Sequence, residues 1–378
     1  MSFDAPTNHR NFPGRSGNRF DTLLHAGNIV EHLHPFILGM ILLILAILST
    51  RLQWIFSLEI FSFMLLDWLL IGLLPIAGKS FGPIKPTVLL LSFFRSLFAF
   101  LPAPISLIFQ GVGTLLVIYG FWVEPEHLTL TEQHLFSDKI KFTKPLRVLH
   151  LGDLHIERLT VREKKLQELI EDTRPDLILF TGDILNLSYR NDPQAIEAAR
   201  LVIGKWQAPL GVFLVSGSPA VDLPQIFPQL VKGLPVRWLQ DEVVTVPYGD
   251  DEIELVGLSC THDPKVDSAQ LHELVGRDSA GRHLRILLYH SPDMAPEAAN
   301  EAIDLQLSGH THGGQVRLPL YGAIYTASLT GKRYESGRKQ IGDMTLYVTR
   351  GIGMEGAAAP RVRFLCAPEI ILWYISSS

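Results

Sequence analysis

Several classes of protein are excluded by what this chain has little of. It contains only two cysteines, Cys260 and Cys366, in 378 residues. It therefore has neither a disulfide framework nor the cysteine spacing of a zinc knuckle, and we expect a reducing compartment. The formal net charge is -5, and no basic cluster provides the positive surface that nucleic-acid binding needs, so we expect no nucleic-acid partner. Internal repeats and long low-complexity tracts are also missing.

What the chain does have is an abrupt change of composition near residue 124. Leu, Ile and Phe dominate from about Pro35 to Val123, whereas charged and apolar residues mix from Glu124 onward, as in a soluble domain. A chain of this length accommodates two domains. We predict a polar N-terminal segment over 1–34, an α-helical transmembrane region over 35–123, a linker over 124–144 and an α/β domain over 145–378.

The transmembrane region is predicted to contain three or four helices. A span needs about 20 mostly apolar residues. Three segments approach or meet that length, namely 36–50, 54–74 and 105–123. A fourth segment, 87–101, is shorter and forms a fourth span, a re-entrant segment or an interfacial helix. We favour a tight hairpin that turns at Pro102 and Pro104.

Charged residues in this region bear on its packing and orientation. Arg95 in the short segment requires a partner inside the bundle, for which Glu59 and Asp67 are the candidates. Basic residues precede the first span, at Arg10, Arg15 and Arg19, and lie in the second loop, at Lys79 and Lys85, whereas the first loop has Arg51 alone. With four spans, this bias places the C-terminal domain in the cytoplasm, which we favour; with three spans, the domain faces outward. The protein is thus expected to be a multi-pass protein of the cell membrane.

The C-terminal part reads as an α/β domain. Short apolar runs alternate with amphipathic stretches of helical period, such as the one that carries Leu166, Leu169 and Ile170. The runs that we interpret as strands are 146–151, 176–180, 211–215, 253–258, 286–289 and 305–307. Polar residues follow these runs, and ligands bind at the carboxyl ends of strands in open α/β sheets.

The polar residues at the predicted strand ends are almost all oxygen or imidazole donors. In chain order they are Asp153, His155, Asp183, Ser218, His290, His310 and His312. Carboxylate and neutral imidazole together suit Mn, Fe, Zn or Co, and their number fits a site for two divalent metal ions that share one carboxylate. Such a pair of ions clamps a phosphoryl group and activates water, so the pattern predicts hydrolysis of a phosphoester.

The order of these motifs resembles the calcineurin-like metallophosphoesterase superfamily. That superfamily has Asp-x-His, Gly-Asp, Gly-Asn-His-Asp/Glu, a lone His and Gly-His-x-His, and four of these five blocks are present here. The stretches 307–315, 347–364 and 368–370 resemble its membrane-associated bacterial branch. The resemblance covers about residues 145–375 and implies a fold of two facing sheets flanked by helices.

The resemblance also implies roles for the individual residues. Asp153, His155 and His312 would hold one metal ion, and His290 and His310 would hold the second. Asp183 would bridge the two ions, and Asp183 and His290 would be catalytic. The neighbouring Asn186 is expected to be a turn residue or to support the ligands from behind rather than to bind metal.

One motif departs from the superfamily pattern. Ser218 and Pro219 stand where the superfamily has Asn and His. A serine hydroxyl is a weaker ligand than an amide oxygen, so the second metal ion should bind more loosely. Pro219 has no proton to donate, and no other residue is identified for the missing histidine. Asp222, His262 and Asp263 are candidates to reach in from nearby loops, but each is interpreted as a surface or loop polar residue.

The motifs leave three functional classes open. The favoured one is a membrane-bound phosphodiesterase or pyrophosphatase that acts on a lipid-linked or nucleotide-linked substrate, by analogy with branch members that cleave a UDP-linked lipid A precursor. The alternative is a catalytically impaired protein that keeps the fold for binding or regulation. A transporter is the third class, and the scarcity of charges within the spans argues against it.

Overall fold

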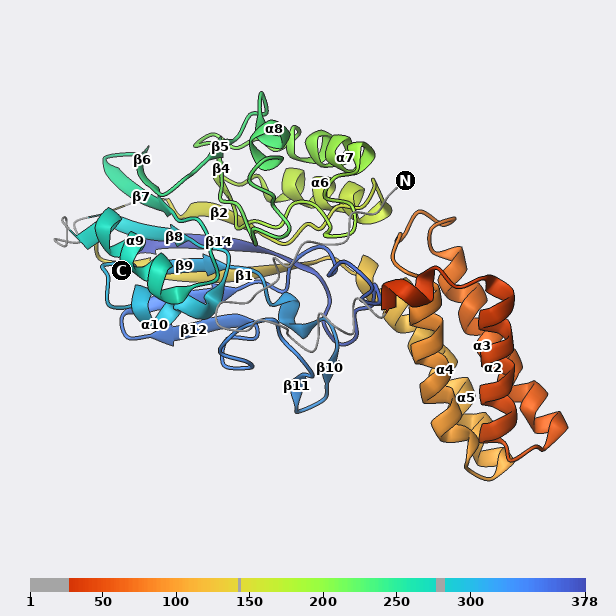
Figure 1. The fold of residues 1–378 in the computed structure, drawn as a ribbon. Helices are drawn as coiled ribbons and strands as arrows, with labels where there is room; N and C mark the ends of the chain where they lie inside the picture. Colours follow the sequence, from red (N-terminus) through yellow and green to blue (C-terminus); the bar gives the residue numbers. More distant parts are fainter. Residues whose placement is uncertain (1–26, 142–143, 277–282) are drawn as a thin grey trace. The chain divides into compact units, whose positions relative to one another are not determined.

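The computed structural model describes residues 27–141, 144–276 and 283–378, which divide into two compact units (Figure 1). The larger unit contains His127–Met354 and Leu365–Ser378, and the smaller, helical unit contains the described residues up to Glu126 together with Glu355–Phe364. The polar segment that carries Arg10, Arg15 and Arg19 lies mostly outside the described residues.

The helical unit consists mainly of four apolar helices. They are α2 (Pro35–Ser49), α3 (Trp54–Leu73), α4 (Lys85–Ala99) and α5 (Ala103–Ile118), the last of which continues through a π-helical turn, η1 (Tyr119–Val123), and a 3-10 turn, η2 (Glu124–Glu126). By length and composition, α3 and the continuous helix Ala103–Glu126 can cross a membrane, whereas α2 is apolar but shorter. The short segment around Arg95 forms a helix that turns at Pro102 into α5, as the hairpin prediction required.

The predicted partner of Arg95 is Asp67. The two side chains form a buried bidentate ion pair, with Arg95 Nε 2.5 Å from Asp67 Oδ2 and Arg95 Nη2 2.6 Å from Asp67 Oδ1. Gln110 and Thr114 of α5 accept further hydrogen bonds from the guanidinium. Glu59, the other candidate, is exposed. A charged residue on an apolar helix is therefore compensated by three neighbouring polar groups.

The larger unit contains two six-stranded sheets. The order in the first is β1 (Thr129–Ser137), β14 (Glu369–Ser377), β2 (Leu146–Leu151), β3 (Leu177–Phe180), β4 (Val212–Leu214) and β5 (Arg237–Trp238). The order in the second is β12 (Gly337–Ile341), β13 (Met344–Val348), β9 (Leu305–Ser308), β8 (Leu284–Leu288), β7 (Asp251–Gly257) and β6 (Glu242–Tyr248). Strands β2 to β5 are parallel, and so are β7, β8, β9 and β13. A small hairpin, β10 (Arg317–Leu318) and β11 (Gly322–Ala323), lies outside both sheets.

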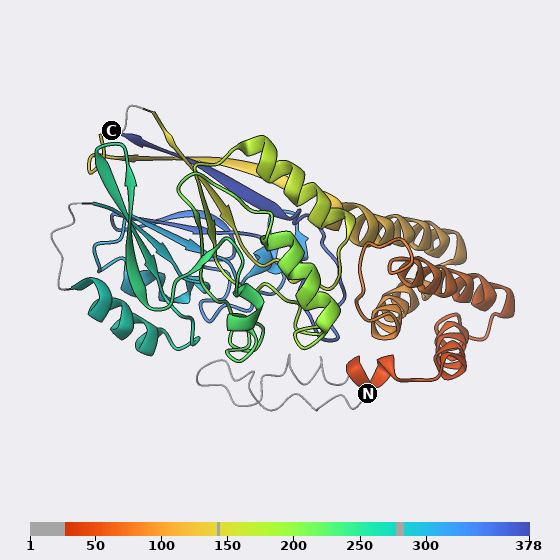
Figure 2. The ribbon, with the colours of Figure 1, turned by 90° about the horizontal axis from the view of Figure 1, so that it is seen from above.

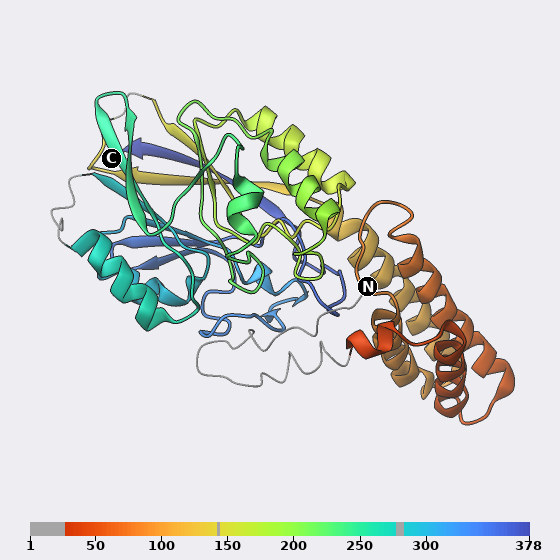
Figure 3. The same ribbon diagram turned by 45° about the horizontal axis from the view of Figure 1, so that its top comes forward.

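Helices cover the outer faces of the two sheets and pack against each sheet through a separate hydrophobic core. The main ones are α6 (Val161–Thr173), α7 (Pro193–Ile203), α8 (Phe227–Val231), α9 (Pro264–Val275) and α10 (Ala295–Ala298). Figure 2 shows α6 and α7, in yellow-green, along one sheet, and Figure 3 shows α9, in teal, along the other.

Side chains on opposite faces of each strand pack into different hydrophobic clusters, and these clusters separate the layers of the unit. Leu149 packs in one cluster with Leu166 of α6, whereas Leu146 lies in a second cluster with Ile286 and Leu305 of the other sheet. A third cluster joins β8 and β13 to α9 and α10. The unit is therefore a helix–sheet–sheet–helix sandwich, which confirms the predicted two-sheet α/β fold.

Two boundaries differ from the expected ones. The stretch 124–144, which we expected to be a linker, contains β1, and this strand pairs in parallel with β14 over its whole length. Residues Glu355–Phe364 belong to the helical unit rather than to the α/β unit. The polar–apolar alternation of β1 is typical of an edge strand, which composition alone does not separate from a linker.

Candidate metal centre

The carboxyl ends of the parallel strands bring all the predicted site residues to one place. Asp153 and His155 follow β2, Asp183 follows β3 and Ser218 follows β4, all from the first sheet. From the second sheet, His290 follows β8, and His310 and His312 follow β9. All seven side chains are buried. The centre is therefore assembled between the ends of two sheets.

Asp153, His155 and His312 form one group of metal-ligand atoms. One donor atom from each lies within 4.8 Å of the others. The Nε2 atoms of His155 and His312 face each other at 2.9 Å. Both oxygens of Asp153 accept a hydrogen bond from the backbone N–H of His310, at 3.0 and 3.1 Å, which fixes the orientation of the carboxylate.

Asp183 lies between this group and His290. Its Oδ2 is 3.5 Å from His155 Nε2 and 3.4 Å from His290 Nε2. His290 is oriented from behind, because its Nδ1–H donates to the carbonyl of Thr181 at 2.8 Å and leaves Nε2 directed at Asp183. Asp153, Asp183 and His290 form the second group whose donor atoms lie within 4.8 Å of one another.

The backbone at the centre adopts an unusual conformation. Five of the predicted ligands have a positive φ: Asp153 (51°), His155 (42°), Asp183 (61°), His310 (73°) and His312 (51°). Non-glycine residues in this region are strained by roughly 1–2 kcal/mol each. The tight strand-end turns thus direct carboxylate and imidazole side chains inward at a cost in stability.

The charges of the centre are strongly coupled. Burial by itself raises the pKa of Asp183, but the nearby His290, His155 and His310 outweigh burial, so the pKa lies well below its ordinary range. For His290, burial lowers the pKa, but the nearby carboxylates of Asp183 and then Asp153 outweigh burial and raise the pKa to about 9. An ionised carboxylate surrounded by imidazoles is an environment that a divalent cation can occupy when the imidazoles are neutral.

The loop of the altered motif lies against Asp183. The backbone N–H of Ser218 donates to Asp183 Oδ1 at 2.8 Å, and Ser218 Oγ lies 3.1 Å from His290 Nε2. Gly217 is required here, because an added Cβ would lie 2.2 Å from Asp183 Oδ1. Pro219 is exposed and offers no side-chain donor, as expected.

Asp222, which we expected at the surface or in a loop, is buried beneath this motif. Its carboxylate accepts hydrogen bonds from the backbone N–H groups of Asp183 (2.8 Å), Gly217 (2.8 Å) and Ile184 (3.0 Å). Burial, followed by the charge of Asp183, raises the pKa of Asp222 to about 7. Asp222 therefore holds the turns after β3 and β4 together.

His262 is the other residue that the motifs did not place at the centre. It lies in the loop after β7, half-buried, with Nε2 3.0 Å from Ser218 Oγ and its ring centroid 4.6 Å from that of His310. A signal was available in the sequence, since the apolar run 253–258 ends in polar residues like the other runs. Asp263 instead caps α9 by accepting from the N–H of Lys265.

Asn186 behaves as a turn residue. Its amide Nδ2 donates to the carbonyl of Met354, and its Oδ1 accepts from the N–H of Ser188. Both amide groups are thus used in stabilising the loop after β3. The prediction that Asn186 is not itself a ligand agrees with these contacts.

The donor set fits divalent metal ions. Two buried imidazole nitrogens face each other at 2.9 Å, and one carboxylate oxygen lies about equally far from an imidazole on each side. Mixed carboxylate and imidazole donors suit Mn, Fe, Zn or Co. Asp153, His155 and His312 could hold one ion, and Asp153, Asp183 and His290 a second, whereas His310 belongs to neither of these two groups.

Comparisons with known proteins agree with this architecture. Residues 146–314 match the calcineurin-like phosphoesterase family. The chain is 31% identical over 268 residues to an uncharacterized metallophosphoesterase, YkuE, of Bacillus subtilis, covering 69% of this chain and 90% of that protein. It is 29% identical over 275 residues to the phosphodiesterase YaeI of Escherichia coli, with 67% and 90% covered. It is 23% identical over 315 residues to the UDP-2,3-diacylglucosamine pyrophosphatase LpxG of Chlamydia trachomatis, with 68% and 91% covered.

Proposed function

Because the chain belongs to the calcineurin-like metallophosphoesterase family, we propose that it is a membrane-anchored, metal-dependent hydrolase of a phosphodiester or pyrophosphate bond. The observation that carries the proposal is the position of Asp183 Oδ2, 3.5 Å from His155 Nε2 and 3.4 Å from His290 Nε2. A carboxylate oxygen between two imidazole-containing groups is what a pair of adjacent cations requires.

Each residue of the centre has a defined task in this proposal. Bound divalent cations would stabilise the charge of a phosphoryl group and make bound water more acidic. The Ser218 N–H holds Asp183 in place, the His310 N–H holds Asp153, and the Thr181 carbonyl orients His290. These bonds prepare the donors before any ligand arrives, so that little reorganisation accompanies binding.

The altered motif restricts the substrate. Pro219 cannot protonate a leaving oxygen, and the loss of a general acid typically reduces rates by about 10² to 10⁴. A pyrophosphate or an activated diester needs this help least, because its leaving group is already stable. LpxG is named as a pyrophosphatase of a UDP-linked, diacylated sugar, which supports a lipid-linked or nucleotide-linked substrate for this chain.

The helical unit provides the proposed anchor. The helix α3 and the continuous helix Ala103–Glu126 are long enough to span a bilayer, and α2 and α4 would complete a four-span bundle with both ends in the cytoplasm. Reporter fusions placed after Val123 test this topology. Activity of a cytoplasmic reporter alone supports four spans, whereas activity of a periplasmic reporter alone contradicts them.

The test of function compares the wild-type chain with Asp183→Ala, purified in detergent. Metal content is measured by elemental analysis, and hydrolysis of an activated aryl phosphodiester is measured with added Mn²⁺. We expect two equivalents of metal and turnover in the wild type and the loss of both in the variant. Asp172→Ala, at an exposed position of α6, is the matched control.

The alternative function is a protein that keeps the fold for binding or regulation, and the observation that favours it is Pro219. Substoichiometric metal in the wild type, together with a rate equal to that of Asp183→Ala, would establish this alternative and overturn the enzymatic proposal.

A further inference from the structure

The second predicted metal site has only the weak donor Ser218 in place of the expected Asn, and His262 of another loop lies beside it. Ser218 Oγ lies 3.1 Å from His290 Nε2 and 3.0 Å from His262 Nε2. Both imidazole nitrogens therefore lie within hydrogen-bond distance of one hydroxyl group. We infer that His262 is a ligand of the second metal ion, in the position that the side chain of Ser218 is too weak a donor to fill.

The arrangement of rings supports this inference, which rests on the proposed function. The ring centroid of His262 is 4.6 Å from that of His310 and 6.1 Å from that of His290, and the His290 and His310 centroids are 5.2 Å apart. Three imidazole rings thus lie together, and Asp183 Oδ2 is 3.4 Å from Nε2 of one of them, His290. Three nitrogens and a carboxylate oxygen are a suitable donor set for Zn, Mn, Fe or Co.

His262 shares the position and backbone conformation of the other donors. It follows a parallel strand, β7, at its carboxyl end, as Asp153, Asp183 and His310 follow theirs. Its φ is 62°, within the range of 42° to 73° of the five predicted ligands that have a positive φ. A non-glycine residue in this conformation is strained, and such strain is concentrated at functional sites.

The loop that carries His262 is held in place by Asp267 of α9. The carboxylate of Asp267 accepts from both the backbone N–H (3.0 Å) and the hydroxyl (2.6 Å) of Thr261. It also accepts from the hydroxyl of Tyr289 at 2.5 Å, and Tyr289 directly precedes His290. The loop of His262 and the strand end of His290 are therefore attached to one buried carboxylate, which restrains both segments.

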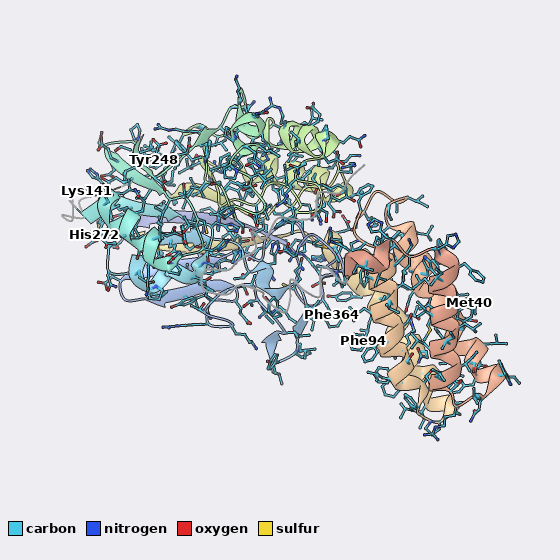
Figure 4. All side chains as sticks on the ribbon, in the orientation of Figure 1. Met40, Phe94, Lys141, Tyr248, His272 and Phe364 are labelled. Carbon is cyan, nitrogen blue, oxygen red and sulfur yellow. The ribbon has the colours of Figure 1, made fainter. Side chains whose placement is uncertain are left out.

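The experiment measures metal binding directly. The full-length chain in detergent is stripped with a chelator and titrated with Co²⁺, whose visible absorption reports each bound ion, and stoichiometry is checked by elemental analysis. Wild type, His262→Ala and His272→Ala are compared. His272 is the matched control because its side chain on α9 is 72% exposed and lies 3.0 Å from Glu301, away from the metal centre (His272 is labelled in Figure 4).

We expect two Co²⁺ equivalents in the wild type and in His272→Ala. In His262→Ala, the first equivalent should bind with unchanged affinity, which also shows that the variant is folded, and the second should bind at least about tenfold more weakly. Two equivalents with wild-type affinity in His262→Ala would overturn the inference, even if turnover fell, because His262 would then act on the substrate. An absence of bound metal in the wild type would instead refute the proposed function itself.

Discussion

Asp222 should be one of the most important single residues for the stability of the α/β unit. Its buried carboxylate accepts three backbone hydrogen bonds, from Asp183, Gly217 and Ile184, and thereby joins the turns after β3 and β4. Each buried N–H that loses its acceptor destabilises the folded state by about 1–3 kcal/mol. Asp222→Ala removes all three acceptors, so the free energy of unfolding should fall by at least about 3 kcal/mol.

Asp222→Asn provides an internal comparison. The remaining amide oxygen can take the place of Oδ2 and accept from Asp183 and Gly217, so that only the bond from Ile184 is lost. We expect this variant to lose about 1–3 kcal/mol, roughly a third of the loss in Asp222→Ala if the three bonds contribute equally. The graded loss distinguishes missing hydrogen bonds from a general disturbance of the loop.

Thermal unfolding of the metal-free, full-length protein measures this difference without a contribution from bound ions. For a unit of this size, 1 kcal/mol corresponds to about 2–4 °C in the midpoint, so Asp222→Ala should unfold about 6–12 °C lower or more. Asp172→Asn, on the exposed side of α6, should unfold like the wild type. If Asp222→Ala unfolded within a degree or two of that control, the role assigned to these hydrogen bonds would be wrong.

Three further predictions concern other parts of the chain. Burial lowers the pKa of His150 from 6.5 to about 3, so only the unfolded state binds a proton at this residue between pH 7 and pH 5. The contribution of His150 to the free energy of unfolding should therefore fall by about 2 kcal/mol over this range, and the difference in unfolding midpoint between the wild type and His150→Gln should change with pH accordingly. Asp67→Leu leaves Arg95 buried without its carboxylate and should destabilise the helical unit by about 3–5 kcal/mol. Thermal unfolding in detergent should show that adding Arg95→Leu restores the unfolding midpoint, and no such recovery would contradict the pairing. Gly217→Ala places a Cβ 2.2 Å from Asp183 Oδ1 and should weaken metal binding at least about tenfold in a Co²⁺ titration, and unchanged affinity would show that the turn adjusts freely.

Much of the α/β unit could be predicted from the sequence because its signals are local. The run 146–151 coincides with β2, and the other apolar runs overlap β3, β4, β7, β8 and β9 within a few residues. Strands buried on both faces are continuous apolar runs that end in polar turns, so both their position and their functional end are visible in the chain. The predicted ligands follow from the same property, because each comes shortly after a run.

What could not be predicted depends on contacts between distant segments. Pairing of β1 with β14 joins residues more than 200 positions apart, and its alternating pattern is shared with many exposed segments. Asp222 is inaccessible to motif reasoning, because its role consists of accepting backbone N–H groups, which every sequence contains. His262 was at a strand end like the ligands, but only the folding of the second sheet against the first brings it to Ser218.

The strained backbone of the centre bears on the choice between an enzyme and a binding protein. Glycine would adopt a positive φ at positions such as His155, His310 and His312 without the steric penalty of roughly 1–2 kcal/mol that a side chain brings. A chain maintained only for its fold would therefore gain stability by replacing these histidines. Their imidazoles instead lie against one another and beside a buried carboxylate, an arrangement that a cation held between them would stabilise. The motif at Ser218 and Pro219 is altered, but the strained backbone that directs the other predicted ligands inward is retained. We therefore expect the centre to bind metal.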